Sequence, residues 1–182
     1  MADLQTDILH LFRDNPVGDA VRDIPWAFSV SETLHFIGLS MLVGALLLVD
    51  LRILGVAKNV SYATVLKLVP VAILGFAINL ISGFVLFTSD PFMYWPNPLF
   101  KLKMAVVVLA GLNALWFTFA EEKKLLALPE GAKVPTMIRT TAILSLTFWL
   151  LVILGGRLLP TFEAYGDVGF EPTPVAAPAS AP

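Results

Sequence analysis

The sequence predicts an all-α integral membrane protein, a bundle of four transmembrane helices, and three observations lead to this fold class. Hydrophobic residues make up 57% of the 182 residues and charged residues only 14%, whereas a soluble domain has about 45–50% and about 25%. The mean hydropathy is +0.81. Four long runs also lack charged side chains altogether. A chain this short cannot cover so many apolar side chains by itself, so we expect the lipid bilayer to contact part of its surface.

The four uncharged runs are 17 to 22 residues long and comprise Thr33–Val49, Leu68–Ser89, Met104–Ala120 and Thr140–Gly156. A spanning helix needs about 20 residues, within a range of roughly 17–25. With their flanks, these runs predict spans near residues 26–50, 63–88, 99–120 and 138–160. Helices are predicted because an isolated strand would leave its backbone N–H and C=O groups unpaired in lipid. Pro70 falls in the first turns of the second span, where a missing N–H is tolerated.

The segments outside the spans differ from them in composition. Residues 1–25 predict an N-terminal extramembrane segment with five aspartates and two arginines, which we do not expect to act as a cleavable signal peptide. Within it, Asp3–Phe12 predicts a short amphipathic helix, either on the membrane surface or in water. Residues 161–182 are rich in proline and alanine and predict a disordered tail.

The distribution of Lys and Arg predicts the orientation. Seven of these residues lie in or beside the loops after spans one and three, and five lie on the other side. Because cytoplasmic loops carry an excess of basic residues, we expect both termini on the outer face. In a bacterium this means the inner membrane with periplasmic termini.

Several function classes have no support in the sequence. The net charge of −2 gives no indication of nucleic-acid binding. The absence of cysteine excludes thiolate metal sites, cysteine nucleophiles and c-type haem attachment. The chain has no nucleophile triad, phosphate loop or His-Glu-x-x-His motif, so enzymatic activity is not indicated.

Charged residues recur at a spacing of 18 in three of the spans. The pairs are Glu32 with Asp50, Lys103 with Glu121, and Arg139 with Arg157. Eighteen residues make five helical turns and about 27 Å, so each pair shares a face. One interpretation is that these residues mark the membrane boundaries and reach into the headgroups. The other is that they point inward and pair as an outer layer of Glu32, Lys103 and Arg157 and an inner layer of Asp50, Glu121 and Arg139.

His35 is the one histidine within a span, about nine residues or roughly 13 Å along the helix from Trp26. It follows Glu32 by three positions, so the two side chains project from one helix face and could bind a metal. Met104 could add a soft ligand for copper(I). His35 could equally carry a proton, bind haem b, or serve packing only. Haem would need a second ligand, from His10, a methionine or a second subunit.

Two asparagines and a glycine stripe lie within the spans. Asn79 and Asn113 are near mid-membrane and need partners, either as interhelical contacts or as the lining of a polar cavity. Gly75, Asn79 and Gly83 repeat every four residues and predict a packing face. On span three, Ala110 and Ala114 predict a second small-residue face.

The stretches Leu34–Gly55 (LHFIGLSMLVGALLLVDLRILG), Asn97–Lys103 (NPLFKLK) and Ala110–Ala114 (AGLNA) resemble an uncharacterised family of bacterial four-helix inner-membrane proteins. The resemblance covers most of residues 24–160 and implies architecture more than activity. It emphasises Trp26, His35, Gly44, Asp50, Arg52, Asn97, Lys103 and Asn113. More distantly, the start of span one is similar to the copper-resistance D proteins and to b561-type cytochrome bundles, although those haem bundles have paired histidines.

Three functions therefore remain open from the sequence. The first is a membrane module that binds or passes a small cation, copper or a proton, at Glu32, His35 and Lys103. The second is a haem- or quinone-linked redox subunit. The third is a structural or assembly subunit, in a homo-oligomer or a larger membrane complex, whose polar residues fix helix packing.

Overall fold

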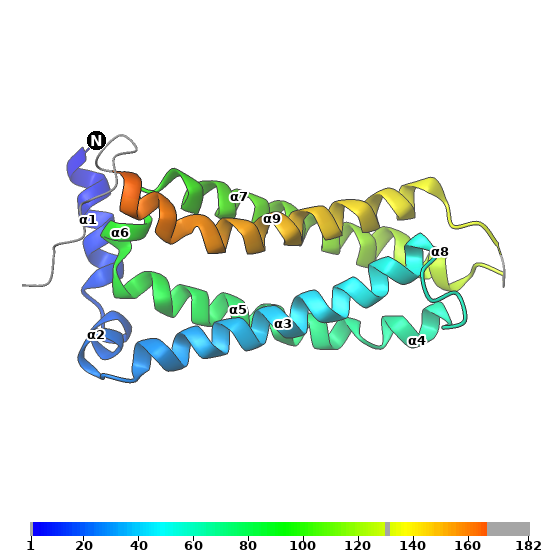
Figure 1. Ribbon diagram of the computed structural model, residues 1–182, viewed down its shortest axis with the longest axis horizontal. Helices are drawn as coiled ribbons and strands as arrows, with labels where there is room; N and C mark the ends of the chain where they lie inside the picture. Colours follow the sequence, from blue (N-terminus) through cyan, green and yellow to red (C-terminus); the bar gives the residue numbers. More distant parts are fainter. Residues whose placement is uncertain (1, 130–131, 167–182) are drawn as a thin grey trace, which may run out of the picture.

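The computed structural model describes residues 2–129 and 132–166, and every regular element in that part of the chain is helical (Figure 1). The α-helices are α1 (Ala2–Arg13), α2 (Pro16–Asp23), α3 (Ala27–Leu54), α4 (Tyr62–Leu66), α5 (Val69–Ser89), α6 (Pro91–Tyr94), α7 (Pro98–Trp116), α8 (Glu122–Leu126) and α9 (Thr136–Gly166). A π-helical segment, η1 (Phe117–Glu121), joins α7 to α8. The predicted all-α fold class is confirmed.

Four helical stretches are long and apolar enough to cross a membrane, as predicted. They are Ala27–Leu54, Tyr62–Ser89, Pro98–Leu126 and Thr136–Thr161. Only 6 to 33% of the residues in their most apolar windows are buried within the protein, so most of their side chains face outward and need an apolar solvent. The third stretch continues beyond the predicted end at residue 120 to Leu126, which places Glu121 inside it. Asp50, predicted as the last residue of the first span, lies before its observed end at Leu54.

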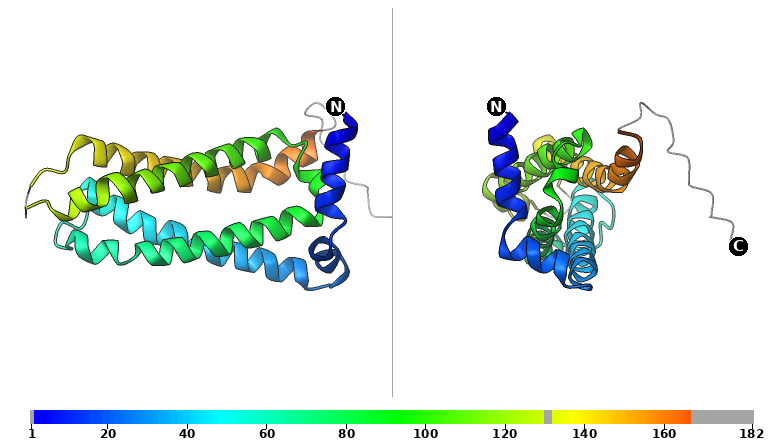
Figure 2. Two further views of the ribbon diagram at one scale, coloured as in Figure 1. Left: turned by 180° about the vertical axis from the view of Figure 1, so that it is seen from behind. Right: turned by 90° about the vertical axis from the view of Figure 1, so that its left-hand side faces the viewer.

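The spans form two pairs, α3 with α5 and α7 with α9, and α3 also packs against α9 (Figures 1 and 2). Between α5 and α7, aromatic side chains make contact at one end, where Phe87 stacks on Phe100 with ring centroids 5.6 Å apart. Backbone contacts between α5 and α7 are sparse among the described residues. The two helix pairs are therefore joined mainly along the α3–α9 side.

The closest helix contact is between α3 and α5. A Cβ atom placed on Gly38 would lie 2.8 Å from the Gly75 carbonyl oxygen, and one placed on Gly75 would lie 2.7 Å from the Gly38 carbonyl oxygen. The two backbones touch because neither residue has a side chain, as is common at helix interfaces in membranes. This contact confirms that the Gly75, Asn79, Gly83 stripe is a packing face.

The N-terminal helices α1 and α2 lie across one end of the bundle (Figure 1). The Arg22 guanidinium donates hydrogen bonds to the carbonyls of Thr88 at 3.2 Å and Arg13 at 2.8 Å, which ties this segment to α5. On α1, Leu9 is buried, whereas Leu4 and Leu11 are exposed. This exposed apolar side suits the membrane interface, the first of the two predicted locations.

Helix α9 passes through Pro160 and continues to Gly166. A proline removes one backbone hydrogen bond, but the turns on either side of Pro160 remain helical. The helix therefore extends six residues into the segment that was predicted to be the tail. The predicted disorder of the remaining residues, 167–182, lies outside the described residues.

The α3–α5 contact gives a first expectation. We expect Gly38→Ala to lower the free energy of unfolding by about 1–3 kcal/mol, because the new Cβ atom forces two backbones apart. Gly44→Ala is the matched control on the same helix, since a Cβ there meets nothing within 4 Å. It should leave stability unchanged or raise it by up to about 1 kcal/mol. Chemical denaturation in detergent, followed by circular dichroism, would measure both, and equal effects would contradict the packing argument.

Candidate functional site

The polar groups near the N-terminal half of α3 satisfy one another. The His35 Nδ1 atom lies 3.1 Å from the Ser82 hydroxyl oxygen on α5, and Asn79 donates from Nδ2 to the His35 carbonyl at 2.9 Å. Because the Ser82 hydroxyl donates to the Ile78 carbonyl at 2.6 Å, it is left to accept a hydrogen bond from His35 Nδ1–H. Asn79 is thus an interhelical contact, the first of the two roles predicted for it.

Lys103, the third residue of the proposed cation site, lies on α7. Its half-buried side chain lies along α9, where Nζ is 3.4 Å from the position of a Cβ on Gly156. A lysine ammonium group only donates hydrogen bonds and has no lone pair for a metal cation.

The predicted metal ligands do not converge. Glu32 is exposed, Met104 is exposed, and His35 is half-buried against Ser82. Among residues 2–129 and 132–166, no three His, Cys, Asp or Glu side chains group into a metal site. His10, the second histidine considered for haem, bonds to Asp14 at 3.0 Å and packs on the Phe92 ring in the N-terminal segment.

The remaining outer candidates occupy boundary or capping positions. Trp26 is 64% exposed at the start of α3, a position typical of interfacial tryptophans. The Asn97 side chain caps α7 by accepting a hydrogen bond from the Leu99 N–H at 2.9 Å, so its structural role is clear. Arg157 is exposed.

A cavity of about 400 Å³ lies between the helices in the other half of the bundle. All four spans contribute to its walls, which are mostly apolar and include three aromatic side chains, Phe76, Phe117 and Trp149. The polar groups that line it are Asp50, Asn113, Thr118, Thr141 and Ser145. Ligand pockets of about 300–1,000 Å³ with apolar walls and a few polar groups are the usual form of a small-molecule site.

Asp50 is the one charged residue among the described residues that line this cavity. It is 5% exposed, and its Oδ2 atom has no hydrogen-bond partner among the described residues. Ser145 lines the same cavity. Two further polar groups of its walls bond to backbone carbonyls: Asn113 donates to the Thr141 carbonyl at 3.1 Å, and the Thr141 hydroxyl donates to the Met137 carbonyl at 3.2 Å. Asp50 therefore presents a free acceptor inside an apolar cavity.

Some residues that line the cavity face outward. Ile73 on α5 and Leu115 on α7 are two of them, and they are 63% and 53% exposed. In a membrane such outward apolar side chains face acyl chains. A molecule dissolved in the lipid could thus reach Asp50 without passing through water.

A second buried carboxylate belongs to Glu121, which is 2% exposed. Its Oε1 accepts a hydrogen bond from Trp116 Nε1 at 3.2 Å, and its Oε2 has no partner among the described residues. Glu121 is the last residue of the π-helical segment Phe117–Glu121. Because a π-turn adds a residue to the helix, the predicted five-turn alignment of Lys103 with Glu121 does not hold strictly.

The three pairs of charged residues spaced by 18 positions thus fit neither single interpretation, that all reach into the headgroups or that all point inward. Asp50 and Glu121 are buried and Lys103 is half-buried, whereas the other three are exposed, namely Glu32, Arg139 and Arg157. The ion pairs in the described part of the chain are His10 with Asp14 and Arg22 with Asp19, both near the N-terminus. Neither predicted layer therefore forms through ion pairs.

The sequence analysis missed the cavity residues of α9. Thr141, Ser145 and Trp149 repeat at intervals of four and are all buried. This spacing places two hydroxyls and an indole on one helix face. The spacing of these three residues is the sequence signal that could have predicted a shared site, although only the fold shows that they line the same cavity as Asp50.

Comparison of the chain with protein-family models, curated proteins and solved structures finds no match. The class is therefore defined by the fold and the site alone. The chain forms a multi-pass membrane protein with four spanning helices and a cavity within the bundle that contains an unpaired carboxylate.

The unpartnered Oδ2 atom of Asp50 predicts that this residue lowers the stability of the folded protein. We expect Asp50→Leu to raise the free energy of unfolding by about 1–3 kcal/mol, because it replaces a poorly compensated buried polar group by an apolar one of similar size. Glu32→Gln, an exposed carboxylate on the same helix, should change stability by less than about 0.5 kcal/mol. Denaturation in detergent would test this, and destabilisation by Asp50→Leu would show that the carboxylate holds the fold together.

Proposed function

We propose that this multi-pass membrane protein binds a lipid-soluble molecule in the cavity between its four spans, with Asp50 as the polar anchor. The observation that carries the proposal is the free Oδ2 acceptor of Asp50 in an otherwise apolar cavity. A buried acceptor without a partner is costly. A ligand that donates a hydrogen bond to this oxygen would remove the desolvation penalty, which favours binding.

The chemistry of the cavity favours a quinol-like ligand, which has an aromatic head with hydroxyl donors and a hydrocarbon tail. The Oδ2 atom of an ionised Asp50 accepts hydrogen bonds, so a ligand with an O–H donor complements this form of the carboxyl group. The aromatic side chains of Phe76, Phe117 and Trp149 offer edges and faces against which a ring can pack. The outward-facing residues that line the cavity would let a tail extend among the lipids. This is the quinone-linked alternative of the sequence analysis, with its site assigned to Asp50.

The cation-binding alternative has less support. It placed a copper ion or a proton at Glu32, His35 and Lys103, but Glu32 is exposed, and no three His, Cys, Asp or Glu side chains of the described residues group into a metal site. Haem ligation would need a second ligand near His35, and His10 instead bonds to Asp14 and packs on Phe92 in the N-terminal segment. The structural or assembly alternative makes a different prediction, because it requires no ligand in the cavity.

Ligand binding can be tested with a pair of matched probes. We expect a tritiated short-chain ubiquinol to bind saturably to the protein in nanodiscs, above the level in protein-free nanodiscs. Its dimethyl ether, which lacks the O–H donors, should bind about tenfold more weakly or worse, since one lost hydrogen bond to a charged group is worth at least about 1.4 kcal/mol.

Variants of the protein complete this test. Asp50→Asn should weaken ubiquinol binding about tenfold or more, and Glu32→Gln should leave it unchanged. Equal binding of ubiquinol and its ether, or full binding by Asp50→Asn, would contradict the role of Asp50. Absence of binding to the unaltered protein would instead favour the assembly role, with a homo-oligomer or a complex partner.

We also propose that the protein lies in a bacterial inner membrane with periplasmic termini, consistent with the family resemblance. The excess of Lys and Arg on the side of the α3–α4 and α8–α9 connections supports this orientation. The cavity would then lie in the half of the membrane nearest the cytoplasm.

The absence of cysteine makes the orientation simple to measure. Single variants Gln5→Cys and Asn59→Cys change exposed residues at opposite ends of the bundle. We expect a membrane-impermeant maleimide to label Gln5→Cys in spheroplasts and to label Asn59→Cys only after the membrane is opened. The reverse pattern would invert the proposed topology.

A further inference from the structure

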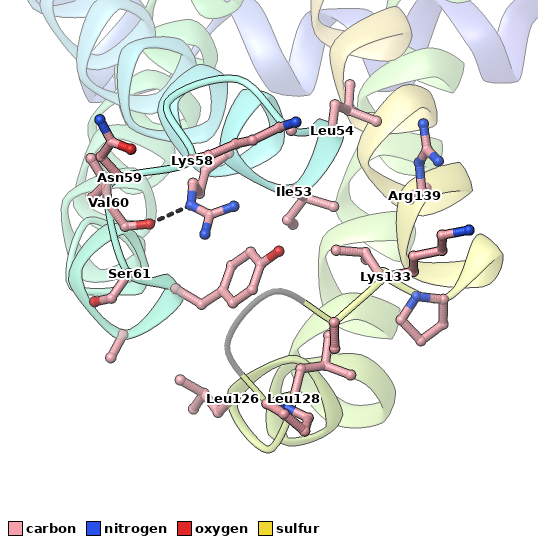
Figure 3. Close-up of a pocket in the computed structure, with 18 of the residues that line it drawn as sticks. Ile53, Leu54, Lys58, Asn59, Val60, Ser61, Leu126, Leu128, Lys133 and Arg139 are labelled. Atoms are coloured by element: carbon pink, nitrogen blue, oxygen red, sulfur yellow. Dashed lines mark hydrogen bonds between the residues drawn. The ribbon is translucent and has the colours of Figure 1, made fainter.

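A second, larger cavity of about 1210 Å³ lies at the end of the bundle opposite α1 and α2. The segments on either side of it are the α3–α4 connection and the α8–α9 connection, which are far apart in the sequence (Figure 3). Helices α3 and α8 end here, at Leu54 and Leu126, and α9 begins at Thr136. The cavity is therefore at the level where the spans leave the membrane.

The charged residues among the described residues that line this cavity are all basic. Four basic residues line it, Arg52, Lys58, Lys133 and Arg139, and none of the described lining residues is acidic. Figure 3 shows basic side chains on both sides of the space, with Lys58 on the α3–α4 connection, Lys133 on the α8–α9 connection and Arg139 on α9. Such a concentration of one charge in a concave site attracts counter-ions.

Arg52 is held in a fixed orientation. Its Nε atom donates a hydrogen bond to the Val60 carbonyl, and its guanidinium carbon lies 4.1 Å from the centroid of the Tyr62 ring. These contacts engage one edge and one face of the guanidinium, and no ion pair of Arg52 exists among the described residues. The Nη groups remain to bind an oxyanion, for which the planar guanidinium fork is well suited.

Apolar residues complete the walls beside the basic groups. Ile53, Leu54 and Val134 line the cavity next to Arg52 and Lys133. A site with basic groups at the membrane boundary and apolar groups beside them matches a phosphate with an attached hydrocarbon part, as in anionic lipids. The same basic groups would also receive a free phosphate compound from water.

We infer that this basic cavity binds a phosphate group, carried either by an anionic membrane lipid or by a soluble phosphate compound. Arg52 and Arg139, from opposite sides, provide its charge-assisted hydrogen bonds. The inference is independent of the ligand proposed for the Asp50 cavity. It also gives Arg52 and Arg139, both singled out in the sequence, a shared role.

The test compares two double variants that remove the same charge at the same end of the bundle. In Arg52→Gln/Arg139→Gln both residues line the cavity, whereas Lys123→Gln/Lys124→Gln changes two exposed lysines of α8 that do not line it. The full chain in detergent would be titrated with phosphatidylglycerol, phosphatidylcholine or inorganic pyrophosphate, and binding would be read by native mass spectrometry. Circular dichroism would verify that each variant remains helical.

We expect phosphatidylglycerol to bind saturably and more tightly than phosphatidylcholine. The Arg52→Gln/Arg139→Gln variant should bind it about thirtyfold more weakly, from two lost basic contacts of about 1 kcal/mol each. The Lys123→Gln/Lys124→Gln variant should change binding less than about threefold. If pyrophosphate shows this same dependence and phosphatidylglycerol does not, the ligand is a soluble phosphate compound. Equal loss in both variants, or no preference for either phosphate probe over phosphatidylcholine, would overturn the inference.

Discussion

The contact of α3 with α5 at Gly38 and Gly75 is the constraint on which the polar contacts of His35 depend. The two backbones are so close that no Cβ atom fits between them, and this closeness lets Asn79 reach the His35 carbonyl and Ser82 reach the His35 ring. By contrast, α5 makes few backbone contacts with α7 among the described residues. Both of these helices contribute, with α3 and α9, to the walls of the Asp50 cavity.

Hydrogen bonding of buried polar groups differs between the two halves of the bundle. Around His35, donors and acceptors are matched by Ser82 and Asn79, as expected for polar residues that join helices in a membrane. Around Asp50, the amide of Asn113 and the hydroxyl of Thr141 bond to backbone carbonyls, which leaves one carboxylate oxygen unpartnered. Buried polar groups are usually satisfied. The Oδ2 atom of Asp50 is an exception, so a ligand is expected there. Charged residues inside the membrane also commonly mark functional sites.

Glu121 is a second buried carboxylate with an unpartnered oxygen, close to the same end of the bundle. It is the last residue of the π-helical segment Phe117–Glu121, and only its Oε1 atom has a hydrogen-bond partner, Trp116. Segments of this kind occur often at functional sites, because the extra residue redirects a side chain. The basic cavity lined by Arg52 and Arg139 lies at this end of the molecule too. The binding features thus gather away from the N-terminal helices, whose contacts with α5 close the opposite end.

The fold class and the four spans could be predicted from the sequence, because uncharged runs of 17 to 22 residues are expected to be helices in a medium without water. The Gly75, Asn79, Gly83 packing face was predictable too, since a spacing of four aligns residues on one side of a helix. Periodicity could not tell which charged residues point inward: Glu32 and Asp50 share a helix face, yet one is exposed and the other buried. This difference is visible only in the folded chain, because burial depends on which neighbouring helix covers each level of α3. The same holds for Thr141 and Ser145, which become part of a site only where α9 brings them to Asp50.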